Sequence, residues 1–314
     1  MKIHFSNVNF SSSSGPNTFG SRLANELTKK GFDIVNHNEY YDIFLCFIEP
    51  SSNPKKGSKF IHRLDGIWFK PEEYHTHNKW IKWSYENADH VIWQSNFDKQ
   101  MTLKHWGNPN RGSIIHNGIE VKKFNKLHPD IEKIKNNFNR IFVCSASWHR
   151  QKRLKENILF YKRVRKEKDV LLVLGKNPDY IEKENNIFYL GHMPHDICLQ
   201  IYSIADWFLH LAWLDHCPNV VIEAMSQGCP IICTDMGGTK EIVKNNGIVI
   251  PEDNPYNFEL TDYDKPYELN INPSAYTLDK KDVLFDLNIG KIANQYIEVF
   301  NESLRFSSQR KLDM

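Results

Sequence analysis

Two acidic and two basic residues occupy positions from which their side chains could act on one ligand. Asp215 and Glu223 are separated by seven residues, and Arg150 and Lys152 follow an apolar run. Guanidinium and ammonium groups stabilise negative charge that develops on a phosphate, and such preorganised charge is often the largest contribution to catalysis. Carboxylates accept strong hydrogen bonds from hydroxyl groups. Side chains of these types could together bind a ligand that carries both negative charge and hydroxyl groups, but in isolation the two acids are more typical of a solvated loop and a helix surface.

The elements that must position these residues follow a regular alternation of short apolar runs and helical patterns. We expect strands over 3–8, 41–48, 59–64, 90–95 and 112–116, and again over 141–147, 170–175, 187–191, 207–212 and 230–234. Runs this apolar are typical of parallel strands that are covered on both faces. Two successive series of this kind predict an α/β protein with two doubly wound domains.

The four candidate site residues follow strands of the second series. Arg150 and Lys152 follow the strand expected over 141–147, and Asp215 follows the strand expected over 207–212. Ligands of doubly wound domains bind beyond the carboxyl ends of the strands. We therefore expect these side chains to reach the same ligand.

A helix is expected to begin at Asn219, directly after the Asp215 loop. Pro218 has no backbone N–H, so the amides of Asn219 and Val220 are the first that a ligand can use. A helix N-terminus favours negative charge through its dipole and its free N–H groups. Glu223 lies one turn inside this helix.

The segment from Asp215 to Glu241 resembles the donor-site signature of the family 4 retaining glycosyltransferases, which have the GT-B fold. That signature has two acidic residues with seven between them, then Ala, Gly, Pro and Gly-Gly-x-x-Glu. Here the acids are Asp215 and Glu223, and the last part reads Gly237-Gly238-Thr-Lys-Glu241. Most of the family has Glu at the first acidic position, so the side chain of Asp215 is one methylene shorter.

Shorter motifs elsewhere resemble the same family and occur in the same order. They are His62-Arg-Leu-Asp65-Gly66, Ala88-Asp89, Gln94-Ser95-x-Phe97, Ile115-x-Asn117-Gly118 and Trp148-His-Arg150-Gln-Lys152-Arg153-Leu154. The resemblance therefore covers nearly the whole chain. It implies two Rossmann-like domains that face each other across a cleft.

The two series of strands, the polar stretch between them and the resemblance together predict a domain plan. Residues 1–139 are expected to form the acceptor-side domain, ending in a polar linker over 119–139. Residues 140–285 are expected to bind the nucleotide-sugar. A helix within 286–314 is expected to cross back and pack on the first domain.

The resemblance implies a role for each candidate residue. Asp215 would accept from donor-sugar hydroxyls and Glu223 from ribose hydroxyls, and the basic residues would meet the diphosphate. The expected catalytic residues are Arg150, Lys152, Asp215 and Glu223. The expected donor-binding residues are Gly15, Asn219, Val220 and Arg153. For His62 and Asp65, a cleft contact and a local hydrogen bond are both open. Neither a metal ion nor a cofactor is expected.

Sugar transfer with retention, from a nucleotide-sugar to a saccharide or lipid-linked saccharide acceptor, is the predicted function. A sugar-nucleotide epimerase of the same architecture and a non-catalytic nucleotide-sugar-binding module are the alternatives. The loop Ser11–Gly20 is not G-x-G-x-x-G, and no acidic residue follows it at the dinucleotide spacing, which argues against an NAD enzyme.

Charge and composition narrow the partners and the compartment. The net charge of +2 does not indicate nucleic-acid binding, but residues 1–139 hold 19 Lys and Arg against 14 Asp and Glu. This excess is compatible with a weak peripheral membrane contact through the first domain. The six cysteines form no Cys-x-x-Cys pair, and no apolar run approaches the roughly 20 residues of a membrane span. We expect a cytoplasmic protein, with any membrane contact at the inner face.

Overall fold

The computed structural model describes residues 1–12, 14–272, 275–279 and 281–312. Its internal contacts divide the chain into two compact units. Unit 1 comprises Met1–Glu120, Phe258–Thr261 and Leu287–Met314, and unit 2 comprises Val121–Asn257 and Asp262–Asp286. The chain therefore passes from one unit to the other four times.

Unit 1 is built on a six-stranded sheet whose strand pairs are all parallel, in the order β2-β1-β3-β4-β5-β6. The strands are β1 (Lys2–Ser6), β2 (Asp33–Ile34), β3 (Ile43–Phe47), β4 (Lys59–Leu64), β5 (His90–Trp93) and β6 (Gly112–Ile114). The helices are α1 (Gly15–Lys29), α2 (Pro71–His77), α3 (Lys79–Asn87), α4 (Asn96–Trp106) and α10 (Ile289–Leu312). The series of apolar runs predicted from the sequence is confirmed as a parallel sheet.

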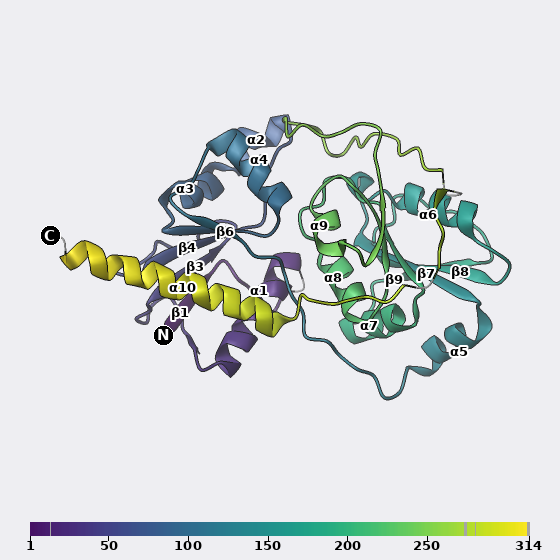
Figure 1. Cartoon of the computed structure of the whole chain (residues 1–314), viewed down its shortest axis with the longest axis horizontal. Coiled ribbons are helices and arrows are strands. Elements are labelled where there is room, and N and C mark those ends of the chain that lie inside the picture. Colours follow the sequence, from purple (N-terminus) through teal and green to yellow (C-terminus); the bar gives the residue numbers. More distant parts are fainter. Residues whose placement is uncertain (13, 273–274, 280, 313–314) are drawn as a thin grey trace. The chain divides into compact units, whose positions relative to one another are not determined.

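Helix α10 belongs to unit 1 although it comes last in the sequence. It packs beside α1 and against β4 (Figure 1). Phe19 of α1 and Tyr296 of α10 are both fully buried, with ring centroids 6.1 Å apart. Phe300, one turn further along α10, is also fully buried. The helix expected within 286–314 thus supplies part of the hydrophobic core of unit 1.

Unit 2 is a second six-stranded parallel sheet, in the order β12-β11-β10-β7-β8-β9. The strands are β7 (Arg140–Ser147), β8 (Asp169–Lys176), β9 (Ile187–Gly191), β10 (Trp207–His210), β11 (Ile231–Thr234) and β12 (Gly247–Ile250). The helices are α5 (Pro129–Asn137), α6 (Leu154–Val164), α7 (His195–Ile204), α8 (Asn219–Ser226) and α9 (Thr239–Val243), and a 3₁₀ turn covers Arg150–Lys152. The prediction of two Rossmann-like domains is confirmed.

The order of the strands in unit 2 reverses between β7 and β10. Strands β8 and β9 extend the sheet on one side of β7, and β10, β11 and β12 extend it on the other. Loops that leave two neighbouring strands at such a reversal diverge, and this opens the crevice in which doubly wound domains bind ligands. The loops after β7 and β10 are therefore the first place to look for a site.

The predicted linker over 119–139 differs from the structure. Residues from Val121 onward belong to unit 2, and Pro129–Asn137 form helix α5. Ile131 and Ile134 share one face of this helix at a spacing of three, and Ile131 is buried. Because lysines and asparagines dominate the segment, its short apolar face is easily overlooked in the sequence. The expected boundary at 139/140 accordingly differs from the observed division at 120/121.

His62 lies on β4 and is fully buried. Its Nε2 is 2.7 Å from the backbone oxygen of Ile48, which accepts the hydrogen bond. Burial lowers the pKa of His62 from 6.5 to about 4, against the smaller opposing effect of this hydrogen bond. His62 is therefore neutral in the folded protein and holds the loop after β3 against β4.

The buried His62 makes the stability of unit 1 depend on pH. Because its folded pKa is depressed, the unfolded chain binds a proton between about pH 6.5 and pH 4 that the folded chain does not. The free energy of unfolding should therefore fall by roughly 3 kcal/mol as the pH drops through that window, which means that the protein becomes less stable. His62→Gln keeps an N–H donor without a titrating group, so its urea midpoint should fall less steeply over this range. His75→Gln, at an exposed position, is the control, and identical pH profiles for the two variants would contradict the assignment.

Candidate active site

The loops after β7 and β10 are joined by hydrogen bonds to backbone oxygens. The amide of Trp213 donates to the backbone oxygen of Gln151 over 2.8 Å, and the side-chain amide of Gln151 donates to the backbone oxygen of Leu214 over 3.4 Å. Trp148, which is 6% exposed, anchors the first loop by donating from its indole nitrogen to the backbone oxygen of Leu174. The 3₁₀ turn and the Asp215 loop are therefore held next to each other.

Lys152, Asp215 and His210 meet at this junction. The Lys152 Nζ is 2.5 Å from Asp215 Oδ2, and His210 Nε2 is 3.1 Å from the same oxygen. The side chains of His210 and Asp215 are largely buried, at 5% and 13% exposure, and that of Lys152 is 20% exposed. Two residues predicted from the sequence are thus brought into direct contact at the point where the strand order reverses.

The charges of this cluster are fixed by its surroundings. Burial by itself would raise the pKa of Asp215, but Lys152 and His210 outweigh it, so this pKa lies far below its usual range. Burial first, with the charge of Lys152, lowers the pKa of His210 despite the opposing effect of Asp215. Asp215 is therefore a carboxylate, and the neutral imidazole of His210 donates to it through Nε2–H. The cluster carries one negative and one positive charge.

The Gly237-Gly238 turn supports the backbone of Asp215. The amide of Gly238 donates to the backbone oxygen of Asp215 over 2.7 Å. Gly237 has a φ of +87°, and a Cβ at this position would lie 2.7 Å from the same oxygen. Only glycine fits such a positive φ and such a close approach without strain. The two glycines of the sequence motif therefore fix the loop that presents the carboxylate.

Helix α8 places Glu223 close to α7 rather than to Asp215. The Glu223 side chain is 8% exposed, and its Oε1 is 3.2 Å from His195 Nε2. Burial first and the charge of Glu223 second raise the pKa of the Cys198 thiol, one turn along α7, to about 11. Asn219 and Val220 form the first turn of α8 and are half-buried. Glu223 is thus a shielded carboxylate whose partner, His195, is half-exposed.

Arg150 and Arg153 have different environments although they are three residues apart. Arg150 is exposed, and within the described part of the chain its side chain forms no ion pair. Arg153 is 1% exposed and donates to both carboxylate oxygens of Glu252, over 2.8 and 2.9 Å, and to the backbone oxygen of Tyr267. The structure therefore corrects the donor-binding role predicted for Arg153, because its guanidinium is already engaged inside unit 2.

Three further predicted residues lie in unit 1. His62 is fully buried and bonded to the backbone oxygen of Ile48, which is the local hydrogen bonding that was one of the two roles open for it. Asp65 forms an ion pair with Arg63, which is 1% exposed and also donates to the side chain of Asn117. This ties the Asp65 carboxylate to a buried network. Gly15 is the exposed first residue of α1.

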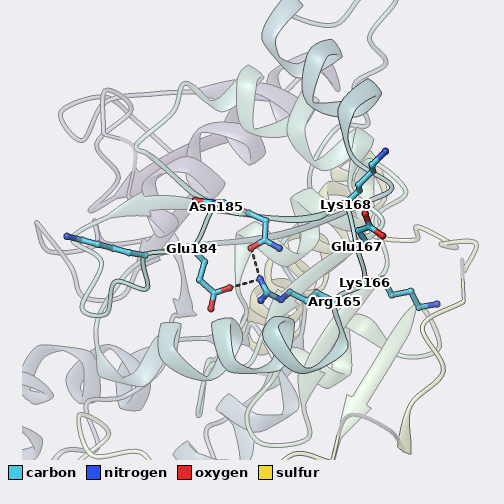
Figure 2. Close-up of a pocket in the computed structure, with 8 residues that line it drawn as sticks. Arg165, Lys166, Glu167, Lys168, Glu184 and Asn185 are labelled. Atoms are coloured by element: carbon cyan, nitrogen blue, oxygen red, sulfur yellow. Dashed lines mark hydrogen bonds and ion pairs between the residues drawn. The ribbon is translucent and has the colours of Figure 1, made fainter.

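A pocket of about 740 Å³ lies at the other end of the unit 2 sheet. Its lining comes from the residues directly before β8 (165–168) and directly before β9 (183–186), that is, from the amino ends of these strands. Figure 2 shows Arg165 directed at Glu184, and the two are 2.5 Å apart. This pocket lies at the amino ends of the strands, whereas ligands of doubly wound domains bind at the carboxyl ends.

Two residues of the site were not predicted from the sequence. His210 stands at the end of a strand that is otherwise apolar, and a buried polar side chain there requires a partner. In the sequence, His195 stands near His192 without a third ligand for a metal ion, which indicates two surface residues. Among the described residues, no group of three or more His, Cys, Asp and Glu could hold a metal ion. Nor does any described helix have the length and apolarity to cross a membrane.

Two family models match successive parts of this sequence. The model described as Glycosyltransferase Family 4 matches residues 4–123, and the model described as Glycosyl transferases group 1 matches residues 128–260. The chain belongs to this group of glycosyltransferases. The family predicted from the motifs is therefore confirmed. The second match contains Arg150, Lys152, Asp215 and Glu223, the residues predicted to be catalytic.

Curated relatives are distant. An uncharacterized glycosyltransferase of Methanocaldococcus jannaschii is 26% identical over 269 residues, which are 76% of this chain and 68% of the relative. The gpi3 subunit of phosphatidylinositol N-acetylglucosaminyltransferase from Schizosaccharomyces pombe is 26% identical over 181 residues, which are 54% of this chain and 39% of that protein. This chain therefore spans well under half of the second relative.

Solved structures share the fold at low identity. HepE of Anabaena, in complex with UDP and glucose, has a TM-score of 0.65 and 16% identity over 96% of this chain and all of its own. Sucrose-phosphate synthase of Thermosynechococcus elongatus has a TM-score of 0.64 and 13% identity over 100% of this chain and 98% of its own. The GT-B fold predicted from the sequence is confirmed by these neighbours.

The different environments of Arg150 and Arg153 predict different effects on stability. Arg153→Met leaves Glu252 buried and unpaired, so the unfolding free energy of unit 2 should fall by about 3–5 kcal/mol. Arg150→Met, at an exposed position, should change it by less than about 0.5 kcal/mol. The double variant Arg153→Met/Glu252→Met leaves no lone charge and should recover much of the loss. Urea denaturation measures all three, and equal stability of the two single variants would refute the structural role of Arg153.

Proposed function

We propose that this protein transfers a sugar, with retention, from a nucleotide-sugar donor to a saccharide or lipid-linked saccharide acceptor. The observation that carries the proposal is the Lys152–Asp215–His210 cluster at the reversal of strand order in unit 2. This is where doubly wound domains bind nucleotides. Membership of the glycosyltransferase group is the second support.

The cluster suits a donor that carries both a diphosphate and hydroxyl groups. Lys152 is partly exposed, so its ammonium can turn from Asp215 towards a phosphate oxygen without a large change in burial. Arg150 is exposed two residues earlier and adds a second cation. The first turn of α8 adds backbone N–H groups and the positive end of a helix dipole. The donor diphosphate is proposed to bind between these groups.

The two carboxylates take the hydroxyl groups in this proposal. Asp215 stays ionised because its pKa is far below neutrality, so it can accept from a donor-sugar hydroxyl as Lys152 turns away. Glu223, one turn inside α8, accepts from the ribose hydroxyls, and His195 holds its carboxylate in place. The UDP and UDP-glucose bound to HepE support a uridine nucleotide as the first donor to test.

The reaction breaks the bond between the sugar C1 and the phosphate oxygen and forms a bond between C1 and an acceptor hydroxyl oxygen. The electron pair of the broken bond leaves with the diphosphate, and the acceptor proton passes to that phosphate on the same face of the sugar. Negative charge on the leaving group grows along this path. Arg150 and Lys152 therefore bind the transition state more strongly than the ground state, as catalysis requires.

Substitutions at the four catalytic positions should have separable effects. Arg150→Ala and Lys152→Ala should each lower kcat by about a hundredfold or more, since each removes preorganised charge. Glu223→Gln should weaken UDP binding by roughly ten- to a hundredfold, because a hydroxyl loses a charged acceptor. Asp215→Asn should lower turnover but spare UDP binding. Calorimetry with UDP and release of UDP from UDP-glucose, with water or methyl glycosides as acceptor, measure these effects.

Lys155→Ala is the matched control, because Lys155 is an exposed lysine at the start of α6. Wild-type turnover in both the Arg150 and Lys152 variants would defeat the mechanism. Unchanged UDP affinity in Glu223→Gln would defeat the ribose assignment. Isomerised UDP-glucose without transfer would instead identify an epimerase, and tight binding without any turnover would identify a binding module. The configuration of the product at C1, determined by NMR, tests retention.

Metal independence is a separate proposal. The diphosphate charge is met by Arg150, Lys152 and the start of α8, so no divalent cation is needed to neutralise it. UDP affinity and turnover should therefore be the same in EDTA as in manganese or magnesium. Activity that is abolished by EDTA and restored by manganese would overturn this proposal.

A further inference from the structure

Trp68 is an exposed aromatic side chain between two buried residues. Ile67 is 4% exposed and Phe69 is 2% exposed, whereas Trp68 is 40% exposed. The flanking side chains anchor the loop in the core of unit 1 and turn the indole outward. The loop, which is otherwise anchored, therefore presents a large apolar ring to water from a defined position.

The backbone of this loop is held rigidly by side-chain amides. Asn78, which is 3% exposed, accepts from the amide of Trp68 over 2.9 Å and donates to its backbone oxygen over 2.6 Å. Gln94 donates to the backbone oxygen of Asp65 over 2.6 Å. The amide of Thr261 donates to the backbone oxygen of Phe69 over 2.8 Å. The indole therefore stands on a fixed backbone, which lowers the entropy that binding would cost.

The loop leaves the ligand-binding edge of the unit 1 sheet. Trp68 is the fourth residue after the carboxyl end of β4, and ligands of parallel sheets bind at this edge. The ring of His77, the last residue of α2, lies 4.9 Å from the indole. The Nδ1 of His77 interacts with Thr76 Oγ1, and in the described part of the chain its Nε2 makes no hydrogen bond. An apolar ring thus lies beside a polar nitrogen that can form a hydrogen bond with a hydroxyl group.

We infer that Trp68 is the platform for a pyranose ring of the acceptor, with His77 Nε2 at its edge. A pyranose has a face of C–H groups and a rim of hydroxyls, which matches an indole face bordered by a hydrogen-bonding nitrogen. Tryptophan offers a large rigid contact area with few rotatable bonds to order. Asn78 acts as a positioning residue, because it holds the Trp68 backbone. The inference rests on the proposed function for the identity of the ligand as an acceptor.

The test uses the full chain and a panel of methyl glycosides. Methyl α- and β-glycosides of glucose, galactose, mannose and N-acetylglucosamine are titrated and followed by saturation-transfer difference NMR. At least one of them should bind, with saturation concentrated on its C–H protons. Trp68→Ala should weaken that binding about tenfold or more, and Trp68→Phe should weaken it less. UDP-glucose affinity should be the same in both variants as in the parent, which separates this test from that of the proposed function.

Trp80→Ala is the matched control, because Trp80 is a 52% exposed tryptophan on α3. It should leave glycoside binding unchanged. His77→Phe keeps a ring beside Trp68 but removes the polar edge, so it should alter the ranking of the glycosides rather than abolish binding. Absence of binding by every glycoside, or equal binding by the parent and Trp68→Ala, would overturn the inference. So would a change in sedimentation of Trp68→Ala with glycoside binding intact, which would show that the ring mediates self-association.

Discussion

A carboxylate buried where the strand order reverses is the constraint on which the site in unit 2 depends. Burying the Asp215 carboxylate away from water costs free energy unless cationic and hydrogen-bonding groups face it. Lys152 and His210 supply them from the neighbouring loop and strand. The close approach of Gly237 to the Asp215 backbone and the hydrogen bond between the two loops hold these three groups together. The site is therefore preorganised by the fold itself.

Two neighbouring basic residues, Lys152 and Arg153, make contacts of different kinds. Arg153 meets Glu252 through a bidentate, fully buried contact, and the planar guanidinium leaves little freedom for another ligand. Lys152 meets Asp215 through a single, partly exposed ammonium, and a compact point charge on a flexible chain can change partners. The first contact fastens α6 to the segment after β12. The contact between Lys152 and Asp215 leaves the ammonium able to bind an anionic ligand.

The sequence was informative where local pattern and tertiary structure agree. The apolar strands and the positions of Lys152 and Asp215 at strand ends could be predicted, because parallel sheets bury both faces and bind ligands at one edge. The environments of Arg153 and His62 could not, because their partners Glu252 and Ile48 are 99 and 14 residues away. Helix α5 was missed since a single buried isoleucine face stands among lysines and asparagines. Burial of a charged residue is decided by its distant neighbours, which one sequence does not reveal.

The position of α10 reverses the usual order of folding during synthesis. Domains that are contiguous in the chain fold as they emerge from the ribosome, with the first domain first. Unit 2 ends at Asp286, whereas the core of unit 1 is completed only by Tyr296 and Phe300. Until those residues are made, the surface of α1 and β4 that α10 covers stays open to water or to chaperones. Of the two units, the one that comes first in this sequence is thus the last to close.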